Sequence, residues 1–205
     1  MTDVFDFNQV DRIDIKVTGS FDENELEEDL EMRCLEFEHL DGGDRTKHVY
    51  ACYGLAMYQA QCLEVGLQSL VRGYHALAGI VTAANIVTYE QEFARKTLGQ
   101  LFATLRQHVH FDDESHRIVV RAVERRNFLA HKYFEVHCED LLHTNGQRTC
   151  VRSLLCMNQL FRYADFILMP FVKVILQKAG LSFEDIDRMA SELRKSVEET
   201  HGVGN

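Results

Sequence analysis

Three polar side chains within six residues of the sequence combine the properties needed to bind an anion and to move a proton. Arg126, Asn127 and His131 supply a guanidinium, an amide and an imidazole group. An arginine keeps its charge at physiological pH and can donate two hydrogen bonds to one phosphate group. A histidine has an unperturbed pKa of about 6.5, so it can accept or donate a proton near neutral pH. We therefore take these three residues as the candidate chemical site.

The position of Arg126 on its predicted helix is unusual for a charged residue. Apolar residues at helical spacing form a stripe along this helix, and Arg126 falls on the stripe, seven residues after Val119 and seven before Tyr133. A charge at a buried or interfacial position costs several kcal/mol unless it is paired or used. The alternative to a chemical role is an ion pair with a carboxylate such as Glu64 or Asp165. The two interpretations are compatible, because Glu64 could orient Arg126 in an active site.

The sequence around these residues resembles a known motif. Residues 125–134, RRNFLAHKYF, are similar to the Rx4–6H motif of HEPN domains, which are small all-helical modules. Arg126 and His131 match the arginine and the histidine of the motif, and a polar residue such as Asn127 follows the arginine in the ribonuclease members. The resemblance covers residues 46–178 and includes YGLA and QCLE on the preceding long helix.

The resemblance implies metal-independent RNA cleavage without a cofactor, in a toxin or defence nuclease. Such cleavage needs a base for the 2′-hydroxyl proton, an acid for the leaving oxygen, and a cation near the developing phosphorane charge. His131 suits either proton transfer, Arg126 suits the cation, and Asn127 can orient the imidazole or donate to a phosphate. One histidine cannot be acid and base in the same step. A two-fold homodimer that brings two motifs to one cleft is therefore expected, as in HEPN ribonucleases.

Basic residues around the motif predict a local RNA-binding surface in an otherwise acidic chain. Residues 116–132 contain five basic residues and one acidic residue, a balance of +4, whereas the whole chain carries −10. The residues expected to guide the RNA backbone are Arg117, Arg121, Arg125 and Lys132. Residues 1–46 hold 15 acidic and four basic side chains. Their Glu-rich helix is interpreted as a solvated face, and shielding of the basic helix is the alternative.

Tyr133 extends the motif to RxxxxHxY. This form resembles HEPN toxins encoded beside a minimal nucleotidyltransferase antitoxin, which can adenylylate the tyrosine. A helix that continued through this segment would place Tyr133 about 20° from Arg126, so the added bulk and charge would block the site. The alternative is a packed aromatic ring with a polar tip.

Two other functions would use the same residues differently. A HEPN-like bundle could hold a nucleotide or a partner protein through the basic helix and cleave nothing. A structural helical adaptor would use Arg126 only in a buried ion pair, and His131 would then be a satisfied core histidine. If the protein is a structural adaptor, Arg126→Ala should lower its melting temperature strongly.

The spacing of apolar residues predicts an all-α fold, an antiparallel bundle with a four-helix core. The core helices are expected at 46–72, 90–108, 113–137 and 148–178. An acidic extension over 1–45 contains a helix at 23–39 capped by Asp22, and a last helix and frayed tail occupy 179–205. Turns are predicted at residues 41–44 and 145–146, and Pro170 is expected to kink its helix. The segment 74–88 fits either a loop or a short helix.

Composition excludes several classes of protein. One proline in 205 residues argues against a loop-rich all-β fold. The most apolar run, residues 163–176, is shorter than the roughly 20 residues of a membrane span, so no membrane helix is expected. No signal peptide is visible, and we expect a cytoplasmic protein. The six cysteines form no CxxC pair, and the histidines at 108, 110 and 116 fit no zinc spacing, so no metal site is predicted.

Overall fold

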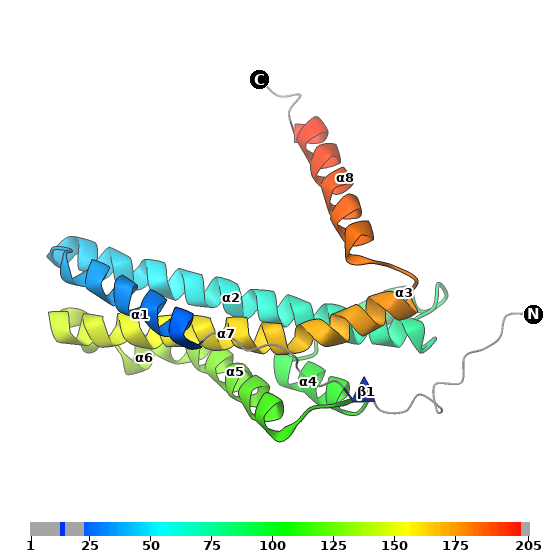
Figure 1. Cartoon of the computed structure of the whole chain (residues 1–205), viewed down its shortest axis with the longest axis horizontal. Helices are drawn as coiled ribbons and strands as arrows, with labels where there is room; N and C mark the ends of the chain where they lie inside the picture. The colour runs from blue at the N-terminus through cyan, green and yellow to red at the C-terminus, as the bar shows by residue number, and fades with distance from the viewer. Residues whose placement is uncertain (1–12, 15–22, 202–205) are drawn as a thin grey trace, which may run out of the picture.

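The chain folds into a helical bundle, confirming the predicted all-α class (Figure 1). A computed structural model describes the backbone of residues 13–14 and 23–201 and the side chains of residues 30–198. Within this part of the chain there are eight α-helices, and two strands of two residues each form one parallel pair, β1 (Ile13–Asp14) and β2 (Val109–His110). The predicted cap at Asp22 and the predicted frayed tail after His201 lie outside the described residues.

Two long helices, α2 (Gly42–Leu77) and α7 (Thr144–Lys178), form the centre of the bundle. They run in the same direction, because Gln147 Nε2 donates to Thr46 Oγ1 near their N-termini and Gly73 packs against Ile175 near their C-termini. The prediction of an antiparallel bundle is therefore wrong for this central pair. The shorter helices between α2 and α7 return the chain to the starting end of the bundle (Figure 1).

The core lies between the apolar faces of these two helices. Small residues on α2, Ala56 and Ala60, are fully buried and allow a close approach of the two backbones. All seven apolar positions predicted for α2 are buried: Val49, Cys52, Ala56, Ala60, Leu63, Leu67 and Leu70. The predicted stripe of α7 is also buried from Val151 to Phe171, and Ile175 is half-buried. Helical periodicity thus located the core correctly.

Both long helices begin earlier than predicted, inside segments interpreted as turns. The Asp41 side chain accepts a hydrogen bond from Asp44 N, so residues 42–44 form the first turn of α2. The Nδ1 atom of His143 accepts from Gly146 N at 2.9 Å, so Asn145 and Gly146 belong to the first turn of α7. The predicted turns are wrong because side-chain caps satisfy the free amides that start each helix. The domain boundary expected after residue 45 falls within α2.

The predicted helix at 90–108 is two helices, α3 (Ile86–Phe93) and α4 (Leu98–Arg106). Thr97 caps α4, and its side chain and that of Gln100 form a reciprocal capping box. This local cap starts a new helix although the apolar spacing continues across the break. The segment 74–88, whose sequence fits either a loop or a short helix, contains the end of α2, a connection and the start of α3.

Helices at the two ends of the chain differ in how they contact the bundle. α1 (Glu23–Glu38) lies along α7, where Phe37 is fully buried and Glu38 pairs with Arg148. α8 (Phe183–His201) leaves the bundle after Gly180, whose φ of +71° provides the sharp turn. Pro170 lies inside α7, which continues through it to Lys178.

No single helix within the described residues has the length and apolar composition to cross a membrane. α7 and α8 meet those criteria only when taken as a pair, with a bend of 89° between them.

We predict opposite effects of two glycine-to-alanine substitutions. A Cβ atom on Gly146 would collide with the backbone of Asp140, so Gly146→Ala should lower the free energy of unfolding by about 2 kcal/mol or more. Gly54, on the exposed face of α2, has no neighbouring atom within 4 Å of its Cβ position. Gly54→Ala should stabilise the protein by up to about 1 kcal/mol through helix propensity. Urea unfolding measures both changes in the free energy of unfolding. A Gly146→Ala protein with unchanged stability would contradict the close approach of Gly146 to the backbone of Asp140.

Candidate functional site

Helix α5 (Asp113–His131) carries most of the residues selected from the sequence. Asp112 caps it, because its carboxylate accepts hydrogen bonds from Ser115 N at 2.8 Å and from Ser115 Oγ at 2.7 Å. These bonds lower the pKa of Asp112 and favour its charged form. α5 runs antiparallel to both long helices and lies against each, so its side chains face two different partners (Figure 1).

The helix predicted over 113–137 breaks at Lys132. α5 ends at His131, Lys132 has φ −128° and ψ −14°, and a short helix α6 (Tyr133–Val136) follows. The break turns Tyr133 into the core, where its ring packs between Tyr53 and His137. The free energy gained by burying this large ring outweighs that of continuing the helix. Apolar periodicity alone does not predict this break.

Tyr133 therefore does not lie beside Arg126, as a continuous helix would require. Its side chain is 1% exposed, and its hydroxyl donates a hydrogen bond to the carbonyl oxygen of Cys150 at 3.2 Å. Burial raises the pKa of Tyr133, and the nearby side chain of Cys150 raises it further. The predicted modification site is thus a core residue in this structure, and a nucleotidyltransferase could reach the hydroxyl only if α6 left the core.

Arg126 lies at the interface between α5 and α2. Its Nη2 atom is 2.6 Å from Glu64 Oε2, and its Nη1 atom donates to Asn127 Oδ1 at 3.1 Å. The side chains of Arg126 and Glu64 are 25% and 21% exposed. Of the two carboxylates considered from the sequence, Glu64 is the partner, whereas Asp165 lies beside Gly66. The pair fixes the direction of a guanidinium group that still reaches the surface.

His131 and Arg126 leave α5 in different directions. They are five positions apart in the sequence, which corresponds to about 140° around an α-helix. Asn127 and His131 are one turn apart, both are exposed, and they share one face. Asn127 links this face to Arg126 through the hydrogen bond of its amide oxygen. Within one chain, Asn127 and His131 therefore lie together on one face of α5, and Arg126 lies on a neighbouring face.

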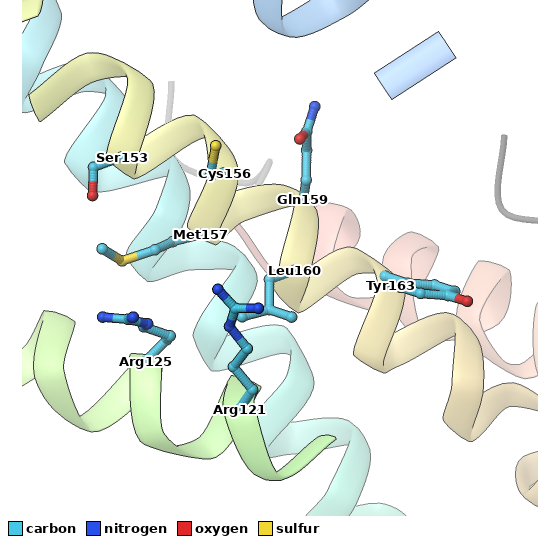
Figure 2. A pocket seen from close by; sticks show the side chains of 8 residues that line it. All are labelled: Arg121, Arg125, Ser153, Cys156, Met157, Gln159, Leu160 and Tyr163. Atoms are coloured by element: carbon cyan, nitrogen blue, oxygen red, sulfur yellow. The ribbon is translucent and has the colours of Figure 1, made fainter. Parts of the chain in front are cut away.

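The predicted RNA-binding arginines face α7. Arg121 and Arg125 point from α5 toward α7 and line one wall of a groove with a volume of about 440 Å³ (Figure 2). The opposite wall belongs to α7: Ser153, Cys156, Met157, Gln159, Leu160 and Tyr163. The guanidinium of Arg125 also lies 5.9 Å from the centre of the Phe128 ring. The groove therefore offers a ligand two guanidinium groups from α5 and a mixture of polar and apolar side chains from α7.

The other two predicted RNA-binding residues lie outside this groove. Arg117 Nη2 lies 4.0 Å from Glu114 Oε1, and Lys132 Nζ lies 3.0 Å from Glu135 Oε2. All four side chains are more than half exposed, so these contacts contribute little to stability and can be exchanged for a ligand's phosphates.

Sequence reasoning missed the α7 wall of the groove. Its polar members recur at helical spacing, beside the apolar stripe that packs on α2: Ser153, Cys156, Gln159 and Tyr163. This polar stripe is the signal in the sequence that indicates the wall. The apolar stripe of the same helix predicts only the face that packs in the core.

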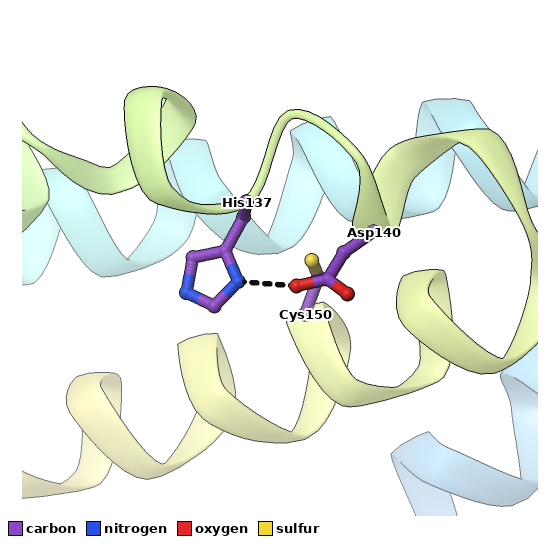
Figure 3. Close-up of side chains that lie close together, drawn as sticks. All are labelled: His137, Asp140 and Cys150. Atoms are coloured by element: carbon purple, nitrogen blue, oxygen red, sulfur yellow. Dashed lines mark hydrogen bonds and ion pairs between the residues drawn. The ribbon is translucent and has the colours of Figure 1, made fainter.

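A second cluster that sequence reasoning did not select joins His137, Asp140 and Cys150 (Figure 3). Their potential ligand atoms lie within 4.8 Å of one another, and His137 Nδ1 is 2.7 Å from Asp140 Oδ2. Burial raises the pKa of the Cys150 thiol, so the free thiol stays protonated near neutral pH. This group could offer three ligands to a thiophilic cation. Among the described residues, no such group includes the three histidines before α5: His108, His110 and His116.

A scan of the chain against protein-family models finds no matching family, and searches of curated proteins and of solved structures find no significant match. The resemblance to HEPN domains therefore depends on the motif residues alone.

We predict that Arg126 and Glu64 are energetically coupled. Removing either side chain leaves the other charge partly buried without its partner, so Arg126→Ala and Glu64→Ala should each cost about 1–3 kcal/mol. A double-mutant cycle by urea unfolding should give a coupling larger than that of the more exposed pair Arg72–Glu90, whose side chains are 36% and 45% exposed. Equal coupling energies in the two pairs would contradict this prediction.

We also predict that the Tyr133 hydroxyl contributes to stability. Tyr133→Phe leaves the carbonyl oxygen of Cys150 without this buried donor and should lower the free energy of unfolding by about 1–2 kcal/mol. Tyr58→Phe, at a position that is 63% exposed, serves as the matched control and should change it by less than about 0.5 kcal/mol. Equal effects would mean that the Tyr133 hydroxyl is not buried in solution.

Proposed function

We propose that this protein is a metal-independent endoribonuclease of the HEPN type, acting as a toxin or defence nuclease. Arg126, Asn127 and His131 from two chains would form one composite site. The observation that supports this most directly is the pairing of Arg126 with Glu64 and Asn127 at the surface of α5. A guanidinium held by two partners has already lost much of its conformational freedom, so phosphate binding would cost less side-chain entropy.

The directions of the side chains favour a site made by two chains. Within one chain, His131 points about 140° away from Arg126 around α5, so the two cannot act on the same atom without a large side-chain movement. A two-fold axis beside α5 would bring His131 of one chain toward Arg126 of the other. The two histidines would then supply a base and an acid, while the arginines stabilise the charge that develops on the phosphorane.

The groove between α5 and α7 supports a second candidate, a module that binds a nucleotide or another phosphate ligand without cleaving it. Arg121 and Arg125 could bind phosphate groups, and Tyr163 offers an aromatic surface on the opposite wall. In the ribonuclease, the same groove would guide the RNA backbone instead.

The ribonuclease predicts cleavage of RNA in the presence of EDTA. Purified protein incubated with total RNA should produce fragments with 2′,3′-cyclic phosphate ends, because the 2′-hydroxyl is the nucleophile. Arg126→Ala and His131→Ala should each reduce the rate at least about 100-fold, the scale of losing general acid–base or electrostatic catalysis. Arg162→Ala on α7 and His39→Ala in the turn after α1, both at exposed positions, are the matched controls and should keep the activity.

Three results would count against this proposal. Cleavage that EDTA abolishes would contradict the metal-independent chemistry. Equal activity of Arg126→Ala, His131→Ala and the controls would place the reaction elsewhere. A folded protein that cleaves no RNA but binds nucleotides, with binding lost in Arg121→Ala and Arg125→Ala, would establish the binding module instead. Circular dichroism of each variant separates loss of function from loss of fold.

A further inference from the structure

Helix α8 projects away from the bundle (Figure 1). It leaves α7 at 89°, and its start is well defined. Asp185 N donates to Ser182 Oγ at 3.1 Å, and Ser182 N donates to Asp185 Oδ2 at 2.9 Å. This reciprocal cap fixes the first turn, but helices in proteins gain most of their stability from packing an amphipathic face against a partner. The unpacked apolar face of α8 therefore calls for a packing partner.

The apolar residues of α8 follow the heptad spacing of a two-stranded coiled coil. They alternate in steps of three and four residues, which places them at successive a and d positions: Phe183, Ile186, Ala190, Leu193 and Val197. The large ones are not covered by the rest of the described chain. Their exposed fractions range from 36% for Ile186 to 66% for Leu193. A continuous apolar seam of this kind is typical of an interaction surface.

We propose that α8 pairs with α8 of a second copy of this chain in an antiparallel coiled coil. In an antiparallel pair, each a position of one helix faces a d position of the other. When Ala190 of one copy faces Leu193 of the second, Ile186 faces Val197. Ala190 of one copy and Leu193 of the other form each of the two central layers, so a small residue meets a large one in both.

Charge complementarity selects the same register. The e positions flanking the seam are Asp187 and Arg194, and both side chains are exposed. In the antiparallel register, Asp187 of each copy lies next to Arg194 of the other, which gives two symmetric ion pairs. In a parallel pair, contacts run between g and e positions, where Met189 would face Arg194 and Ser182 would face Asp187. No opposite charges meet in that arrangement, and Ala190 would face Ala190.

Sedimentation equilibrium of the full chain tests the pairing. The wild type should show a monomer–dimer equilibrium, and Leu193→Asp should weaken it at least about 100-fold, because a charge would be buried in the seam. Leu142→Asp is the matched control, at a position outside α8 that is 84% exposed, and should leave the dissociation constant unchanged. A wild type that stays monomeric would overturn the proposal.

Charge reversal tests the antiparallel register. Asp187→Arg places like charges at both ion pairs, and so does Arg194→Asp, so each variant alone should dimerise about tenfold or more weakly. An equimolar mixture of the two variants should form a heterodimer, because every pair then has opposite charges. The double variant should regain self-association. Lys195→Glu reverses a charge on the outer face of α8 and is the control.

The test does not use the ribonuclease activity as its readout, because the seam lies on α8 and the candidate site on α5. If Leu193→Asp dimerises as tightly as the wild type, the chains associate only through another surface, such as the one beside α5, and the α8 pairing is wrong. It is also wrong if the two charge variants do not prefer each other in the mixture. If the wild type is monomeric and binds anionic lipid vesicles through Leu193, the apolar seam faces a membrane surface instead.

Discussion

The parallel packing of α2 against α7 is the constraint on which the rest of the structure depends. Two helices of 36 and 35 residues that start at the same end of the bundle require the chain to travel back along their length. That distance is about 50 Å for helices of this size. The return is made by α3, α4 and α5, so α5 must run antiparallel to both long helices. Its position against α2 and α7 follows from that topology.

This position explains why neighbouring arginines on α5 have different surroundings. Arg125 and Arg126 are adjacent in sequence, and their side chains point about 100° apart around the helix. Arg125 therefore lines the groove beside α7, and Arg126 reaches Glu64 on α2. One arginine remains available to an anion, and the other is held in place by a carboxylate. A net-negative protein can thus keep a local cationic surface without burying an unpaired charge.

The end of α5 shows how burial competes with helix continuity. Residues 113–137 have helical spacing throughout, but the helix breaks at Lys132 so that Tyr133 can enter the core and donate to the carbonyl oxygen of Cys150. The same break directs the chain into the turn that carries His137 and Asp140 toward α7. The arrangement of this corner therefore depends on one buried aromatic ring, while His131, one residue before the break, stays at the surface.

The sequence by itself determined the fold class and the buried faces of α2 and α7, because helical periodicity is a local property. It offered the pairing of Arg126 with a carboxylate as one alternative, because an unpaired buried charge is costly. Tertiary structure alone decided that α2 and α7 are parallel, that Glu64 rather than Asp165 is the partner, and that Tyr133 is buried. It also placed the polar side of α7 opposite Arg121 and Arg125. These features depend on which helix lies against which face, and a one-dimensional pattern of apolar residues does not contain that information.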